Sequence, residues 1–163
     1  MVEVDWPAGT LAVMTITYTG GRNFVVKTLE ASGDTIDLAV NVIGAYTGTR
    51  PFNFEGDPAY LEIESSGSWE VTIIPFITIE PVVLYPYNGS GDDVLLLASH
   101  LRSGRTTITH QGSRNFVVKA VDTSGRFDLV VNEIGNYSGT VLFRDYFILE
   151  IRADGAWSID AAE

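Results

Sequence analysis

The sequence contains no cysteine, only two histidines and no long apolar run, and each of these scarcities excludes a class of protein. Without cysteine the chain has no disulfide, thiolate metal site or cysteine nucleophile. No apolar stretch reaches the roughly 18 residues that a membrane-spanning helix needs, so we expect no membrane span. The histidines, His100 and His110, stand in neither a Gly-x-Ser-x-Gly nor a His-Glu-x-x-His motif. We therefore expect a protein that is not an enzyme and has no catalytic residues.

Basic residues are scarce as well. The chain carries 21 Asp and Glu against 10 Lys and Arg, which gives a formal net charge of −11. An acidic surface repels phosphate, and no basic stripe offsets it, so nucleic acid is not an expected partner. Only two of the basic residues are lysines. This composition suits a salty or extracellular setting, although GC-rich coding produces it equally.

What the sequence does contain is an internal duplication. The hexamer RNFVVK occurs at residues 22–27 and again at residues 114–119. Alignment of residues 20–49 with residues 112–140, with one deletion, gives 18 identities in 30 positions. The match resumes downstream, where YLEIESSGSW in the first copy corresponds to ILEIRADGAW in the second. Repetition of a unit of this length predicts tandem domains or a pseudo-symmetric fold.

The pattern inside each copy is that of β-strands. Short runs rich in Val, Ile, Thr and aromatic residues alternate with breaks that contain glycine, and we find no sustained helical periodicity. Five to seven strands spaced about 8 to 12 residues apart are typical of a sandwich or small barrel. We predict an all-β protein of two tandem, homologous, antiparallel β-sandwich units with a jelly-roll-like topology, residues 1–79 and 80–163. Asp93–Leu97 is one of the predicted strands.

Residues that both copies share are expected to serve the common fold. Trp69 and Trp157 recur beside apolar runs, so we predict that both fill the core. Glu62 and Glu150 recur within strands and are predicted to face solvent. Asn41 and Asn132 stand just before turns, and Gly44 and Gly135, which follow them, are predicted to adopt a positive φ.

Residues that differ between the copies are where a specific function is expected. Trp6 has no counterpart, the loop NFEGDPA at Asn53–Ala59 has no full counterpart, and YNGSGDD at Tyr87–Asp93 occurs once. From these stretches we select the candidate ligand-binding residues Trp6, Asn53, Glu55, Asp57 and Tyr87.

The same stretches offer one metal hypothesis. Ca²⁺ takes six to eight oxygen ligands from carboxylates and carbonyls in turns, and Asp92 and Asp93 are adjacent donors, with Glu55 and Asp57 as further ones. Neither loop has the spacing of an EF-hand, and Gly-Asp turns are common without an ion. Calcium is thus the single cofactor considered, with no cofactor as the alternative.

The strings NFVVK, DLVVNEIGNYSGT and LEIRADGAW, together with YNGSGDDVLLL before the second copy, resemble a β-sandwich repeat of secreted, lipid-anchored and cell-envelope proteins of bacteria, particularly actinobacteria, and of some archaea. The resemblance covers most of both copies and implies an extracellular or cell-envelope location. VEVDWPAG after Met1 is not a secretion signal, so we expect either that the chain stays inside the cell or that a signal segment has been removed.

The first copy has no segment equivalent to Tyr87–Asp93, so its sheet is expected to have an unpaired edge that invites self-association. We expect a non-catalytic module for adhesion, recognition or spacing, with a protein or glycan at the cell surface as its partner. Two alternatives stay open. One is a structural subunit of a fibre, capsid or appendage, and the other is a carbohydrate-binding module, which would display a row of exposed aromatic residues.

Overall fold

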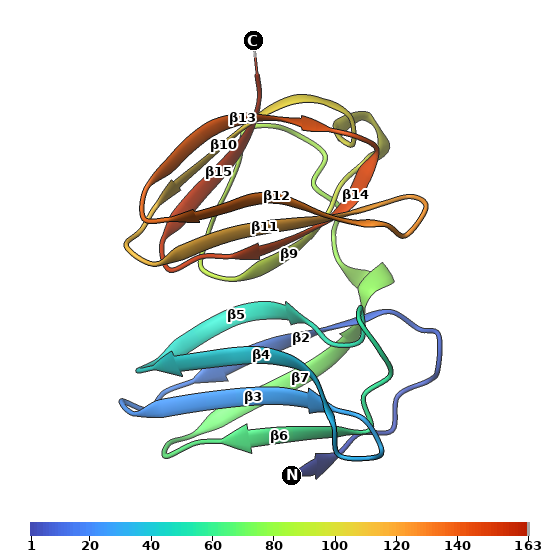
Figure 1. The fold of residues 1–163 in the computed structure, drawn as a ribbon, viewed down its shortest axis with the longest axis vertical. Helices are drawn as coiled ribbons and strands as arrows, with labels where there is room; N and C mark the ends of the chain where they lie inside the picture. The colour runs from blue at the N-terminus through green and yellow to red at the C-terminus, as the bar shows by residue number, and fades with distance from the viewer. Residues whose placement is uncertain (163) are drawn as a thin grey trace. The chain divides into compact units, whose positions relative to one another are not determined.

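The computed structural model describes residues 1–162, which form two compact units, one spanning Met1–Thr78 and one beginning at Ile79. Each unit is built almost entirely of antiparallel strands arranged in two sheets (Figure 1). The predicted all-β sandwich class is therefore confirmed. In the described part of the chain, no helix has the length and apolar character needed to cross a membrane.

The strands follow the glycine-punctuated pattern of the sequence. The first unit contains β1 (Val2–Glu3), β2 (Ala12–Tyr18), β3 (Asn23–Leu29), β4 (Thr35–Ile43), β5 (Tyr46–Pro51), β6 (Tyr60–Glu64), β7 (Trp69–Pro75) and the short 3₁₀ helix η1 (Phe76–Thr78). The second unit contains β8 (Tyr87–Ser90), β9 (Asp93–Leu96), the 3₁₀ helix η2 (Ser99–Leu101), β10 (Gly104–Gln111), β11 (Asn115–Asp122), β12 (Phe127–Ile134), β13 (Tyr137–Phe143), β14 (Tyr146–Arg152) and β15 (Ala156–Ala161).

The second unit has the strand order of a jelly roll. One of its sheets runs β13-β10-β15-β8 and the other β12-β11-β14-β9, so eight strands are shared between two four-stranded sheets. The first unit repeats this order with β5-β2-β7 and β4-β3-β6-β1. The counterpart of β8 is missing from the first unit as described, so its smaller sheet ends at β7. The short strand β1 takes the place that β9 has in the second unit.

Each core lies between the two sheets of its unit. In the first unit, alternate residues of β2 meet the inward side chains of β3, β4 and β6, which include Phe24, Val26 and Leu61. In the second, β10 and β15 face β11 and β14 in the same way, with Phe116, Val118 and others buried between them. Because side chains of a strand alternate between its faces, Thr15 and Thr17 of β2 point outward and are exposed, and apolar residues such as Leu129 and Ile134 are exposed on β12.

The repeated hexamer forms the N-terminal part of β3 and β11. Its Phe24 and Phe116 are fully buried, as are the valines two positions on. Both copies carry a β-bulge at the same place, between Val26 and Lys27 and between Val118 and Lys119. Lys27 then points outward, where its Nζ lies 2.5 Å from the Glu62 carboxylate on β6. Both copies therefore keep the same strand with the same β-bulge.

The turn prediction is confirmed, because Gly44 has φ of 97° and Gly135 has φ of 84°. Two other predictions were wrong. Trp157 is buried, with 3% of its surface exposed, but Trp69 is 42% exposed because no strand covers it. Glu150 was expected to face solvent, yet it is only 7% exposed and accepts a hydrogen bond from Arg152 Nε at 3.1 Å.

Candidate functional site

Three of the predicted ligand-binding residues meet at one small cavity in the first unit. The cavity has a volume of about 90 Å³ and is lined by Trp6, Ala8, Phe52, Asn53, Asp57 and Pro58. Pockets that enclose whole small molecules usually measure about 300–1,000 Å³. The cavity therefore has room for a single side chain or a few atoms, and not for a whole ligand.

Hydrogen bonds inside the protein hold the walls of this cavity. Trp6 Nε1 donates to the carbonyl oxygen of Thr10 at 2.7 Å, and Asn53 Nδ2 donates to the same oxygen at 2.9 Å. Asn53 Oδ1 accepts a hydrogen bond from the Ala12 amide at 2.8 Å, and the Trp6 ring meets Phe52 edge-on at 6.1 Å. Trp6 and Asn53 thus fasten the loop that leads into β2, which is a structural role that the sequence did not reveal.

The remaining candidates do not join this cavity. Glu55 lies exposed on the same loop but outside the cavity lining. Tyr87 belongs to β8 of the second unit, where its ring lies 6.1 Å from that of Trp157. Burial, and secondarily the charge of Asp93, raises the pKa of the Tyr87 hydroxyl. Tyr87 therefore packs on its own unit's core.

The two predicted calcium donors, Asp92 and Asp93, each accept a hydrogen bond from a backbone amide. Asp92 Oδ1 accepts from the Ala153 amide at 2.9 Å, and Asp93 Oδ1 accepts from the Val94 amide at 2.8 Å. Among residues 1–162 no group of three or more His, Cys, Asp or Glu side chains is placed to hold a metal ion. Two engaged carboxylates do not supply the six to eight oxygens that Ca²⁺ takes. The calcium hypothesis stays a prediction, and the structure adds no donors to it.

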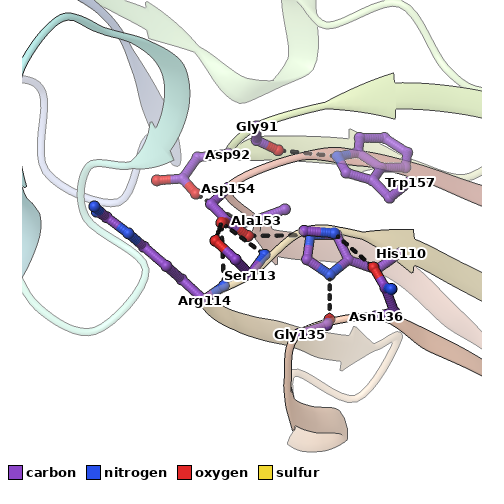
Figure 2. Close-up of polar contacts among 11 residues, drawn as sticks. Gly91, Asp92, His110, Ser113, Arg114, Gly135, Asn136, Ala153, Asp154 and Trp157 are labelled. Atoms are coloured by element: carbon purple, nitrogen blue, oxygen red, sulfur yellow. Dashed lines mark hydrogen bonds and ion pairs between the residues drawn. The ribbon is translucent and has the colours of Figure 1, made fainter.

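A polar network in the second unit connects the buried His110 with the partly exposed Asp154 (Figure 2). His110 is 1% exposed, and its ring stacks on Phe116 with centroids 4.3 Å apart. His110 Nδ1 lies 2.8 Å from the carbonyl oxygen of Gly135, and because a carbonyl only accepts, Nδ1 carries the proton of that bond. Nε2 on the other side of the ring faces Asp154 Oδ1 at 3.5 Å.

Asp154 also caps the turn between β10 and β11. Its Oδ2 accepts hydrogen bonds from the amides of Ser113 at 2.9 Å and Arg114 at 3.1 Å, and from the Ser113 hydroxyl at 3.0 Å. Partial burial acts to raise the pKa of Asp154, but these hydrogen bonds together outweigh it and lower that pKa. Gly112 fits beneath the pair because a Cβ there would lie 2.2 Å from Asp154 Oδ1.

The network contains the residue types of a hydrolase triad without its order of contacts. In a triad the serine hydroxyl donates to the histidine, and the histidine donates to the aspartate. Here the Ser113 hydroxyl donates to Asp154, and the proton on His110 Nδ1 goes to Gly135. Ser113 is therefore not activated as a nucleophile, and the arrangement acts as a turn clamp.

The first unit places a different pair of polar residues at the equivalent positions. Tyr18 stands in the place of His110 and stacks on Phe24 at 4.4 Å, and Ser66 stands in the place of Asp154. The Tyr18 hydroxyl lies 3.1 Å from Ser66 Oγ. Sequence reasoning missed this site because it judged each histidine by catalytic motifs. The aligned copies held one signal for this site: the first copy has Tyr18 and Ser66 where the second has His110 and Asp154.

The largest difference between the units lies at the free edge of β7. In the second unit β15 pairs on one side with β10 and on the other with β8, with Trp157 opposite Gly89 and Ile159 opposite Tyr87. In the first unit β7 pairs with β2, and no strand within residues 1–162 pairs with its other edge.

The uncovered edge exposes side chains that belong to the core face. Trp69, Val71 and Ile73 lie opposite Tyr18, Ile16 and Met14 of β2, which are all buried, so they face the interior. Nevertheless Trp69 is 42% exposed, and Val71 and Ile73 are only partly buried. The first unit therefore presents an apolar strip beside an open sheet edge.

The backbone of β7 shows which groups this edge offers. Ser68 and Phe76 form backbone hydrogen bonds with Thr19 and Leu11 on the β2 side. Because partners alternate along an antiparallel strand, the even-numbered residues of β7 bond to β2, and Trp69, Val71 and Ile73 direct their N–H and C=O groups to the open edge. Pro75 also falls on this side, where its lack of an N–H removes no hydrogen bond.

The fold and these sites define an all-β protein of two homologous jelly-roll sandwich units, and within residues 1–162 the smaller sheet of the first unit has an open edge at β7. No family model matches the chain, and no curated protein matches it.

Proposed function

We propose that the chain is a non-catalytic recognition module of the extracellular or cell-envelope class, and that it binds a polypeptide partner at the open edge of β7. The observation that carries the proposal is the contrast between Trp157, covered by β8, and its exposed equivalent Trp69. An exposed edge binds an extended peptide through main-chain hydrogen bonds, and neighbouring apolar side chains add specificity.

The contacts of the network around His110 support a binding role over a catalytic one, because its serine is held by a carboxylate and not by the histidine. Carbohydrate binding has less support. A sugar-binding face presents several coplanar aromatic rings, whereas Trp157 is buried and Trp6 packs edge-on against Phe52. Among the three tryptophans, only Trp69 is exposed, and it lies beside the open sheet edge.

The test is to pan a displayed library of linear peptides on the chain and on a Val71→Pro variant. Val71 directs its N–H to the open edge, so proline there removes an edge donor and no bond to β2. The matched control is Val71→Thr, which keeps the N–H and the β-branched shape. We expect enriched peptides to bind the parent and Val71→Thr and to lose binding to Val71→Pro. Equal binding to all three proteins would reject the proposal.

A further inference from the structure

We propose that the peptide accepted by β7 has the pattern aromatic-x-Gly and lies antiparallel to β7, with its glycine opposite Trp69 and its aromatic residue opposite Val71. This inference rests on the proposed function and specifies its ligand. The second unit is the template, because there β8 occupies the equivalent edge with Gly89 opposite Trp157 and Tyr87 opposite Ile159. The aligned sequences place Trp69 and Val71 at the positions of Trp157 and Ile159.

The requirement for glycine comes from the tryptophan ring. A Cβ added to Gly89 would lie 2.2 Å from Cζ2 of Trp157 and 2.4 Å from its Cη2, distances that real Cβ contacts do not reach. The strand thus passes directly over the indole, and Trp157 Nε1 donates to the carbonyl oxygen of Gly91 at 2.9 Å. A strand that covers Trp69 in the same way has no room for a side chain at that position.

The requirement for an aromatic residue comes from the apolar strip. Tyr87 packs beside Trp157, with ring centroids 6.1 Å apart and planes inclined by 35°. It belongs to the partly buried residues that close that core. An aromatic side chain two residues before the glycine points to the same face of the strand, so it would cover Val71 and Ile73, which are left partly open in the first unit.

The middle residue, x, is selected by charge. In the second unit Asn88 lies opposite Ser158, whereas the equivalent of Ser158 in the first unit is Glu70, which is exposed. Residues 1–78 contain 10 acidic and 3 basic side chains, so the net charge of this unit is −7. An opposite charge across two strands is favourable, and a Lys or Arg at x would lie opposite Glu70.

The experiment adds three synthetic peptides to the ¹⁵N-labelled full chain. The first is YPYNGSGD, which copies residues 85–92; the second replaces its first glycine by valine, and the third replaces its asparagine by lysine. With the first peptide we expect slowed exchange at the amides of Trp69, Val71 and Ile73, and an upfield shift of the peptide glycine Hα protons from the Trp69 ring current. The valine peptide should bind roughly 5- to 100-fold more weakly, because overpacking of this size is costly. The lysine peptide should bind about 1.4- to 5-fold more tightly.

Four outcomes would overturn the inference. The valine peptide could bind as tightly as the parent peptide and protect the same amides, which would remove the glycine requirement and leave the proposed function standing. A second outcome is that none of the three peptides protects these amides. The inference then fails, and the library comparison with Val71→Pro decides the proposed function separately. Protection that grows with protein concentration alone would identify a second copy as the occupant. Perturbation of Trp157 and Ile159 amides instead would show that the peptide exchanges with β8.

Discussion

At the scale of single residues, the duplication supplies pairs of identical side chains in different surroundings. Trp69 and Trp157 open equivalent strands, yet the first is 42% exposed and the second 3% exposed. The indole of Trp157 also donates a hydrogen bond to the backbone of Gly91, which ties the end of β8 to β15. The two rings are identical, so the difference between the free energies that they contribute to folding comes from β8, which covers Trp157 and not Trp69.

We expect Trp157→Ala to lower the free energy of unfolding of the second unit by about 3–5 kcal/mol, as is usual for a buried aromatic residue. Trp69→Ala should cost the first unit about 1 kcal/mol, since much of its surface is already in water. Urea unfolding followed by amide exchange, read separately for each unit, checks both values. Equal losses at the two positions would contradict the comparison.

The turn clamp of the second unit predicts that His110 and Asp154 are energetically coupled. His110→Tyr and Asp154→Ser convert the second unit's pair into that of the first unit. Each single change should destabilise the second unit by about 1–3 kcal/mol, because it leaves a partner poorly satisfied. The double variant should recover part of the loss, with a coupling free energy of about 0.5–3 kcal/mol. Strictly additive losses in a double-mutant cycle would show that the pair does not act as a unit.

Asp154 also predicts a dependence on pH. Its pKa is lowered from the ordinary 3.8, so its carboxylate favours the folded state above that pH, and the benefit is lost as the pH falls through the lower folded pKa. Asp154→Asn should be less stable than the parent at neutral pH, and the difference should shrink below pH 3.8. Urea unfolding across a pH series measures it. A difference that stays constant down to the acid limit would mean that the ionised form plays no part.

At the scale of elements, β8 is the strand that distinguishes the two units, and Gly89 is the residue that lets it lie over Trp157. Gly89→Val should destabilise the second unit by about 1–3 kcal/mol or more, because the new side chain collides with the indole. Gly21→Ala is the matched control, since a Cβ there meets nothing within 4 Å. Thermal unfolding of both variants tests the pair, and similar midpoints would contradict the close approach.

The strands themselves were largely predictable. The alternation in NFVVK, the glycine breaks and the repeat spacing indicated a sandwich, and Asp93–Leu97 was expected as a strand where β9 runs from Asp93 to Leu96. The candidate site was predictable only in part. Trp6, Asn53 and Asp57 do line one cavity, but their hydrogen bonds point into the protein. The exposure of Trp69 was missed, because its local sequence closely matches that of the buried Trp157.

At the scale of the whole molecule, the described first unit has an open sheet edge at β7, whereas β8 covers the equivalent edge of the second unit. A peptide of the proposed pattern should therefore stabilise the first unit selectively. At a concentration about a hundred times its Kd, a ligand that binds only the folded state adds roughly 2.7 kcal/mol to the free energy of unfolding. Amide exchange of the core residues Phe24 and Phe116 reports the two units separately, and we expect slower exchange at Phe24 alone. Equal slowing at both would point to binding outside the open edge.

The sequence by itself determined the strand pattern and the duplication, because these depend on local periodicity and on comparison of the copies. Only the tertiary structure decided which side chains lie exposed beside the open edge of β7, which edge groups of β7 face outward, and that Tyr18 contacts Ser66 where His110 faces Asp154. These depend on which strands become neighbours across the sandwich, and strand pairing joins residues that are far apart in the chain.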